Sequence, residues 1–185
     1  LDVIDLVAGF DEVITQDNWQ PFFNREIGLS LMYPAARASF TRSTDPGLFV
    51  YSVFADFYDA DISISANFGS AQATGNVHNY LISESNNSYE PYTVRTDSRW
   101  VTSVRLRSGV MGYARSEPHG RGWSTIMIFA DVSERQTLNL ISTTIQRGGQ
   151  QRWSLPANGI LTKMMGAFLE ASDDEPDRTS SNRAP

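Results

Sequence analysis

The sequence predicts a single α+β domain whose core is built on a mainly antiparallel β-sheet. The chain has 185 residues, a length at which one hydrophobic core is the usual arrangement. Hydrophobic residues make up 41% of it and charged residues 19%, as in globular domains rather than disordered chains. Segments with the period-two pattern of strands follow one another in runs, without strict alternation with helical segments, which favours antiparallel pairing.

The chain begins with a segment that has the spacing of a short amphipathic helix. Apolar residues recur at roughly helical intervals up to Ile14, so we expect residues 1–21 to form a helix or linker ahead of the domain. In residues 23–34, apolar positions then alternate with other side chains, which predicts a half-buried strand. Pro34 ends this strand because proline cannot donate a hydrogen bond to a sheet.

Turn signals divide the middle of the chain into further strands and one helix. The sequence Asp45-Pro46-Gly47 is typical of a turn, and residues 58–61 are expected to connect a hairpin. Residues 74–84 change to helical spacing, with Thr74 as the expected N-cap. The predicted strands are 48–57, 62–68, 92–96, 100–117 in one or two pieces, 123–130 and 138–145.

The clearest helical pattern of the chain lies near its end. Ser154 and Pro156 are suited to the first turn of a helix, and apolar residues then form a continuous stripe as far as Leu169. We therefore expect one domain over residues 22–171. Residues 172–185 are acidic and contain few apolar anchors, so they are expected to form a disordered tail.

Residues 23–34, which read FNREIGLSLMYP, carry a recognisable pattern. They resemble the opening strand, F-x-N-x-x-(G)-h-s-h-x-Y-P, of PsbP-like domains. The later order of two strands, a helix containing Val77 and Leu81, a strand meander and a closing helix is also similar, over roughly residues 22–170. The aromatic residue that usually follows the Tyr-Pro step is replaced here by Ala35-Ala36-Arg37.

The resemblance implies an α/β/α sandwich, in which a mainly antiparallel sheet of about six to eight strands has helices packed on both faces. It also implies a role in binding or assembly without catalysis. We expect no cofactor. The superfamily includes many exported bacterial proteins of unknown role. Its members differ widely in their partners, so the fold alone selects none of them.

Composition narrows the range of functions. The chain has no cysteine, which excludes a cysteine nucleophile and a thiolate metal site. Its net charge of −6 argues against nucleic-acid binding, which needs an excess of cations. No run of apolar residues is long enough for a transmembrane segment in this chain. Because the first residue is Leu1 and cysteine is absent, as in many exported proteins, we expect an extracytoplasmic location, periplasmic or secreted.

The sequence offers no catalytic constellation. Its two histidines are His78, expected near the exposed side of the middle helix, and His119, expected in a turn, so we predict no metal site. No nucleophile elbow is present. Asp56, Asp59 and Asp61 form the densest carboxylate group outside the tail, but they lack the glycine and glutamate of a calcium loop and suit a solvated hairpin better.

One cluster of arginine and aromatic residues lies between residues 95 and 123 of this acidic chain. On a strand, Arg105 and Arg107 would project to the same face, where aromatic rings could stack on their guanidinium groups. The alternative is a solvated sheet surface paired with acids such as Glu84, Glu90 or Glu117. The candidate binding residues are Arg105, Arg107, Trp100, Tyr113, Arg115 and Trp123.

These patterns favour a non-catalytic interaction domain of an exported or envelope-associated bacterial protein. Its expected partner is a protein or a small anionic ligand, and we predict no catalytic residues. Two alternatives remain open at this level. One is a hydrolase that uses clustered carboxylates, and the other is a regulatory module that binds a small anion.

Overall fold

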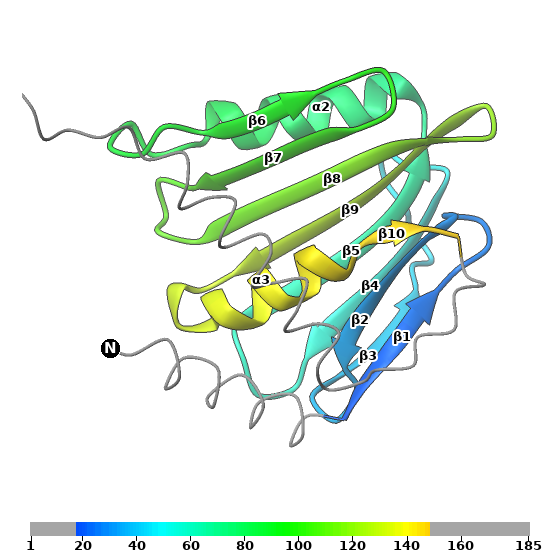
Figure 1. The fold of residues 1–185 in the computed structure, drawn as a ribbon, viewed down its shortest axis with the longest axis horizontal. Coiled ribbons are helices and arrows are strands. Elements are labelled where there is room, and N and C mark those ends of the chain that lie inside the picture. The colour runs from blue at the N-terminus through cyan, green and yellow to red at the C-terminus, as the bar shows by residue number, and fades with distance from the viewer. Residues whose placement is uncertain (1–17, 149–185) are drawn as a thin grey trace, which may run out of the picture. The chain divides into compact units, whose positions relative to one another are not determined.

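The computed structural model describes residues 18–148 (Figure 1). The helix expected before Ile14, the helix expected from Ser154 and the acidic tail lie outside this range. Within it, ten strands form two sheets, and the chain is α+β with antiparallel sheets, as the sequence predicts. No helix in this part of the chain is long and apolar enough to cross a membrane.

The larger sheet has seven strands, in the order β3-β4-β5-β9-β8-β7-β6, and every neighbouring pair is antiparallel. The strand predicted over 100–117 is two strands, β7 and β8, joined by a turn. The strands are β3 (Ala38–Arg42), β4 (Tyr51–Phe57), β5 (Ile62–Gly69), β6 (Tyr92–Arg95), β7 (Trp100–Arg105), β8 (Met111–His119) and β9 (Gly122–Ala130).

The smaller sheet has three strands in the order β1-β2-β10. These are β1 (Trp19–Phe23), β2 (Leu29–Pro34) and β10 (Gln146–Arg147), so sheet pairing begins at Trp19, ahead of the expected start of the domain at residue 22. Both faces of β2 are buried, since Ser30 and Met32 are as inaccessible as their apolar neighbours. The prediction of a half-buried strand is wrong here because β2 lies in the middle of the small sheet, against the large one.

The main core lies between the two sheets. Strand alternation places Ser124, Ile126 and Ile128 on one face of β9. The Ser124 hydroxyl donates to the carbonyl oxygen of Ile27, just before β2, so this face is covered by the small sheet. Ile27, Ile126 and Ile128 are fully buried, as is Leu31 of β2.

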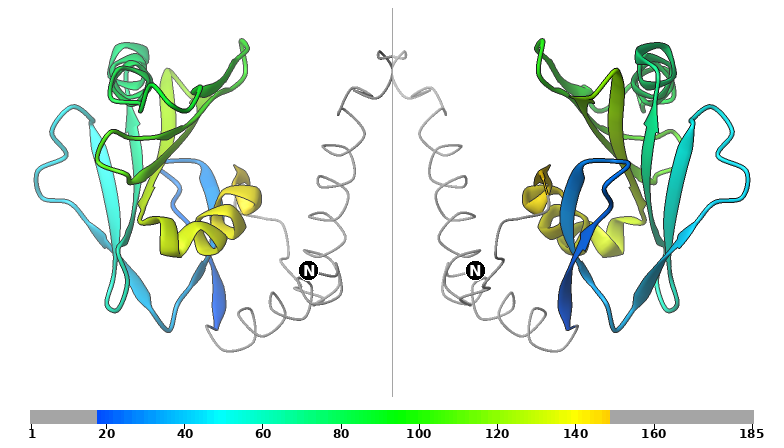
Figure 2. Two further views of the ribbon diagram at one scale, coloured as in Figure 1. Left: turned by 90° about the vertical axis from the view of Figure 1, so that its left-hand side faces the viewer. Right: turned by 90° about the vertical axis from the view of Figure 1, so that its right-hand side faces the viewer.

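Helix α2 (Ala71–Ser83) covers the other face of the large sheet (Figures 1 and 2). Its Leu81 packs against Val104 and Ala114, on β7 and β8. The helix begins one turn earlier than predicted, because the hydroxyl of Ser70, and not that of Thr74, accepts the N-capping bond from the backbone of Ala73.

The expected α/β/α sandwich with helices packed on both faces is wrong. The layer opposite α2 is formed by the three-stranded sheet, with the short helix α3 (Arg135–Thr144) beside β2. The hydroxyl of Thr144 accepts a hydrogen bond from the backbone N–H of Met32, at 2.9 Å, and so ties α3 to β2. The small sheet thus takes the place of the helices expected on this face.

Helix α3 also replaces the strand predicted over residues 138–145. A short 3-10 turn, η1 (Val132–Glu134), precedes it. The backbone N–H of Ser133 in this turn donates to the Asp131 side chain. Within α3, the buried residues Leu138, Ile141 and Thr144 recur every three positions, which is helical spacing. Leu138 and Leu140 are also two positions apart, and over so short a segment this spacing is equally typical of a strand.

Candidate functional site

The face of the large sheet opposite α2 brings together three of the candidate binding residues. Thr102 of β7 contacts α2 through His78, so its neighbours in alternation, Val101 and Ser103, lie on the opposite face. The register pairs Ser103 with Tyr113 and Val101 with Arg115. Arg105, Tyr113 and Arg115 therefore share one face, on the side of the sheet where α3 lies (Figure 1).

Arg105 lines a cleft of about 370 Å³ between the ends of β6, β7 and β8 and helix α3. Its guanidinium group lies 5.0 Å from the centre of the Tyr89 ring, and its Nη1 donates to the Tyr89 hydroxyl at 3.1 Å. These contacts restrict the guanidinium plane. The described residues that line the cleft are Tyr89, Glu90, Tyr92, Ser103, Val104, Arg105, Met111, Gly112, Val132, Arg135, Leu138 and Asn139.

The opposite wall of this cleft comes from the first turns of α3. Arg135 contributes a second guanidinium group and Asn139 an amide, while Leu138 contributes an apolar surface. Against these two cations, Glu90 is the one carboxylate among the described lining residues. The cleft therefore combines positive charge with hydrogen-bond donors, tyrosine rings and an apolar lining, the composition of many ligand sites.

Tyr113 and Arg115 lie further along β8, and Arg115 is already occupied. Burial raises the pKa of the Tyr113 phenol above its usual value, although Arg115 and Arg99 oppose this effect, so the phenol is neutral at physiological pH. Arg115 donates through Nε and Nη2 to one oxygen of Glu117, at 2.9 and 2.6 Å. Arg147 pairs with the second oxygen of Glu117. Two guanidinium groups therefore neutralise this buried carboxylate.

The other three candidates lie away from this face. Strand β7 ends at Arg105, and the side chain of Arg107 turns back to donate to the carbonyl of Ser83, at the end of α2, at 2.9 Å. The expectation that Arg105 and Arg107 share a face is wrong for this reason. Trp100 is buried on the α2 side, and Trp123, the second residue of β9, lies on that same side and pairs with Gly69 and Pro118.

His78 is fully buried, whereas the sequence suggested an exposed position on the helix. Its ring nitrogens bond the hydroxyls of Thr102 and Ser116, each at 2.8 Å, and its ring stacks on Trp100 with centroids 4.2 Å apart. Burial, with a smaller contribution from the charge of Arg95, lowers the pKa of His78 to about 4. Because this histidine is neutral and closed to solvent, it acts as a structural link between α2 and the sheet.

The carboxylates of the β4–β5 hairpin do not converge on a common centre. Asp59 pairs with Arg37 at 3.1 Å, and Arg37 also pairs with Glu134 at 2.9 Å. Asp56 and Asp61 line a separate hollow of about 510 Å³. Among the residues that the structure describes, no group of three histidine, aspartate or glutamate side chains could hold a metal ion.

Sequence reasoning found Arg105 but missed the other wall of its cleft. With a strand predicted over residues 138–145, nothing in the sequence indicates that Arg135 and Asn139 face Arg105. Tyr89 lies in a loop, where periodicity gives no direction for a side chain. The useful signal was the segment Asp131-Val132-Ser133-Glu134, which is typical of a helix start and points to a helix after it.

Comparison with known proteins gives no family assignment: no family model matches the chain, and no curated protein matches it. The site is therefore interpreted from its own residues. Their arrangement is that of a small, positively charged cleft without a nucleophile activated by a base in its described lining.

Proposed function

We propose that this chain is a non-catalytic binding domain and that the cleft between β7 and α3 recognises carboxylate groups. The ligand is a small organic acid or an acidic side chain of a partner protein. The observation that carries this proposal is the presence of Arg105 from β7 and Arg135 from α3 in the walls of one cleft. A planar guanidinium group matches a carboxylate with two parallel hydrogen bonds, which a lysine cannot do.

The surroundings of Arg105 support this function. Tyr89 holds its guanidinium group by a ring contact and a hydrogen bond, so less side-chain freedom is lost when a ligand binds. The whole chain has a net charge of −6. A cationic cleft within such an acidic chain directs an anionic ligand to one place. Tyr92 and Leu138 add surface against which the body of a ligand can pack.

We also propose that the domain is PsbP-like and works outside the cytoplasm. The first proposal rests on the likeness of residues 23–34 to the opening strand of that superfamily. The second rests on the absence of cysteine and on the exported members of the same superfamily. Recovery of the protein in the periplasmic or secreted fraction of its source cells would support this location, and recovery in the cytosol would contradict it.

Titration calorimetry with glutarate, citrate and a glutamate-rich peptide tests the binding function. We expect Arg105→Glu to weaken binding at least about tenfold, because a charge-assisted hydrogen bond contributes about 1.5–3 kcal/mol and the new carboxylate also repels the ligand. Arg107→Glu is the matched control, since Arg107 lies near the end of α2, and we expect it to bind like the wild type.

Equal losses in the two variants, or no binding of any of the three probes, would contradict a carboxylate site at Arg105. The hydrolase alternative has its own test. Turnover of a glycoside or ester panel that is lost in Asp61→Asn would place the function at the hollow lined by Asp56 and Asp61 instead.

A further inference from the structure

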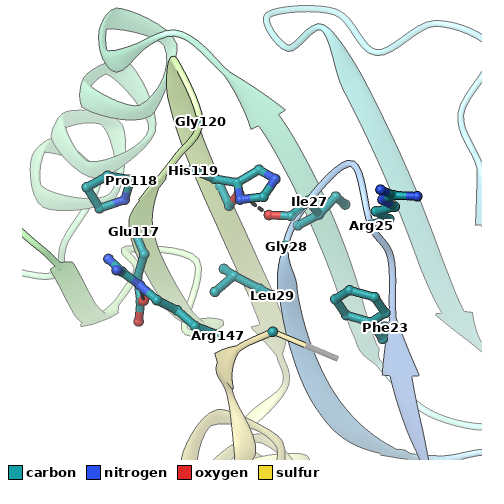
Figure 3. A pocket seen from close by; sticks show the side chains of 12 residues that line it. Phe23, Arg25, Ile27, Gly28, Leu29, Glu117, Pro118, His119, Gly120 and Arg147 are labelled. Carbon is teal, nitrogen blue, oxygen red and sulfur yellow. Dashed lines mark hydrogen bonds and ion pairs between the residues drawn. The ribbon is translucent and has the colours of Figure 1, made fainter. Parts of the chain in front are cut away.

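A second cavity, of about 360 Å³, lies near the other end of β8 (Figure 3). It is bounded by the turn between β1 and β2, by the turn between β8 and β9, and by β10. Its lining shares no residue with the Arg105 cleft. The described residues that line it are Phe23, Arg25, Ile27, Gly28, Leu29, Glu117, Pro118, His119, Gly120, Ser124, Arg147 and Gly148.

Part of the lining of this cavity is apolar. Leu29 lies in the middle of the view in Figure 3, with Phe23 to one side of it. Phe23 is 45% exposed, a large value for an aromatic side chain that is part of a sheet. An aromatic ring left open to solvent beside a cavity gives a ligand an apolar surface to cover.

The charged groups around the cavity have a net positive charge. The carboxylate of Glu117 is buried and is neutralised by two arginines, Arg115 and Arg147. The Arg147 side chain remains 54% exposed. No ion pair in the described part of the chain involves Arg25, which lies on the far side of the cavity from Arg147 (Figure 3).

The backbone around the cavity is held by close contacts between segments that are far apart in the sequence. Gly28 has a φ of +69°, and a Cβ atom at this position would overlap the ring of His119. The N–H of Gly148 donates to the carbonyl of Gly28 at 2.9 Å, which joins the end of β10 to the β1–β2 turn. The ring of His119 also meets Phe68 edge to face. These contacts hold the walls in place before a ligand arrives, which reduces the cost of binding.

We infer that this cavity binds a small amphiphilic acid, with one carboxylate attached to an aliphatic or aromatic body. The carboxylate pairs with Arg25, and the apolar body covers Phe23, the exposed ring of the lining. The volume is within the range of about 300–1,000 Å³ that is usual for small-molecule sites. A compound with a carboxylate but no apolar body makes only the charged contact. A compound with an apolar body but no carboxylate makes only the apolar contact.

Protein-observed NMR of the full chain with octanoate tests this site, with acetate and 1-octanol as matched probes. We expect saturable shifts of amides in residues 23–29, 117–120 and 146–148 with octanoate, and binding at least about tenfold weaker with either control, because each lacks one of the two contributions. Arg25→Ala should weaken octanoate binding about tenfold. Arg121→Ala, an exposed arginine in the neighbouring turn that does not line the cavity, should leave it unchanged.

Several results would overturn the inference. These are the absence of saturable shifts in the three segments, equal affinity for octanoate and 1-octanol, or equal effects of the two alanine variants. The test is separate from that of the Arg105 cleft, because Arg105→Glu should leave octanoate binding unchanged. Loss of octanoate binding in that variant would place the acid in the other cleft.

Discussion

The buried histidine of α2 makes the stability of the domain depend on pH. In the folded state His78 is neutral down to its pKa of about 4, because burial disfavours the charged ring. In the unfolded chain the same ring titrates near its ordinary pKa of 6.5. As the pH falls below 6.5, the unfolded state takes up a proton that the folded state does not, so the free energy of unfolding decreases.

The size of this effect follows from the two pKa values. Between 6.5 and about 4 the free energy of unfolding should fall by about 3 kcal/mol, since each pKa unit corresponds to about 1.4 kcal/mol. Above pH 6.5 the ring is neutral in both states, and its contribution no longer changes with pH. Below the folded pKa the ring is charged in both states, and the loss is complete.

Urea unfolding at a series of pH values from 4 to 8 measures this directly. We expect the difference in free energy of unfolding between the wild type and His78→Gln to shrink by about 3 kcal/mol as the pH falls. Glutamine keeps a donor and an acceptor toward Thr102 and Ser116 but does not titrate. Carboxylates titrate in both proteins and cancel in the difference.

Parallel curves for the wild type and His78→Gln would contradict a lowered pKa of His78 in the folded state. They would mean that the ring takes up its proton equally in the folded and unfolded states, and hence that it is not enclosed between α2 and the sheet.

Three further predictions concern stability and can be checked by urea unfolding at neutral pH. Gly28→Ala should lower the free energy of unfolding by more than about 2 kcal/mol, because the backbone is left-handed and the methyl group meets His119. Gly47→Ala, at a left-handed position in open space, should lower it by about 1 kcal/mol. Equal losses would contradict the close approach of Gly28 to His119. Glu117→Gln should cost about 3 kcal/mol, because it leaves two arginines without their shared carboxylate, and a loss below about 1 kcal/mol would show that the pairs are weak. Ser70→Ala should cost about 1 kcal/mol by removing the cap of α2, and no loss would place the cap elsewhere.

The strands were largely predictable from the sequence because alternation and turn residues have local causes. The turn at Asp45-Pro46-Gly47 and the hairpin between β4 and β5 appear where the residues indicated. The failures come from long-range packing. Nothing local shows that β2 is covered on both faces, since that depends on the large sheet and on residue Gln146, which is 116 positions from Ser30.

The candidate site was predictable only in part, for a similar reason. Alternation along one strand placed Arg105, and the pairing register then brought Tyr113 and Arg115 to the same face. Arg107 was misplaced because β7 ends two residues before it. The contribution of Arg135 depends on how α3 lies against the sheet, and a short apolar segment with mixed spacing does not reveal that.

The proposed carboxylate site in the cleft between β7 and α3 can be tested on the wild-type protein alone. The most direct measurement is a backbone NMR map of wild-type protein titrated with glutarate. We expect saturable shifts that converge on Tyr89, Arg105, Arg135 and Asn139, from both walls of the cleft, and small changes at the end of α2. Shifts centred on Arg107, or spread evenly over the exposed arginines, would contradict it.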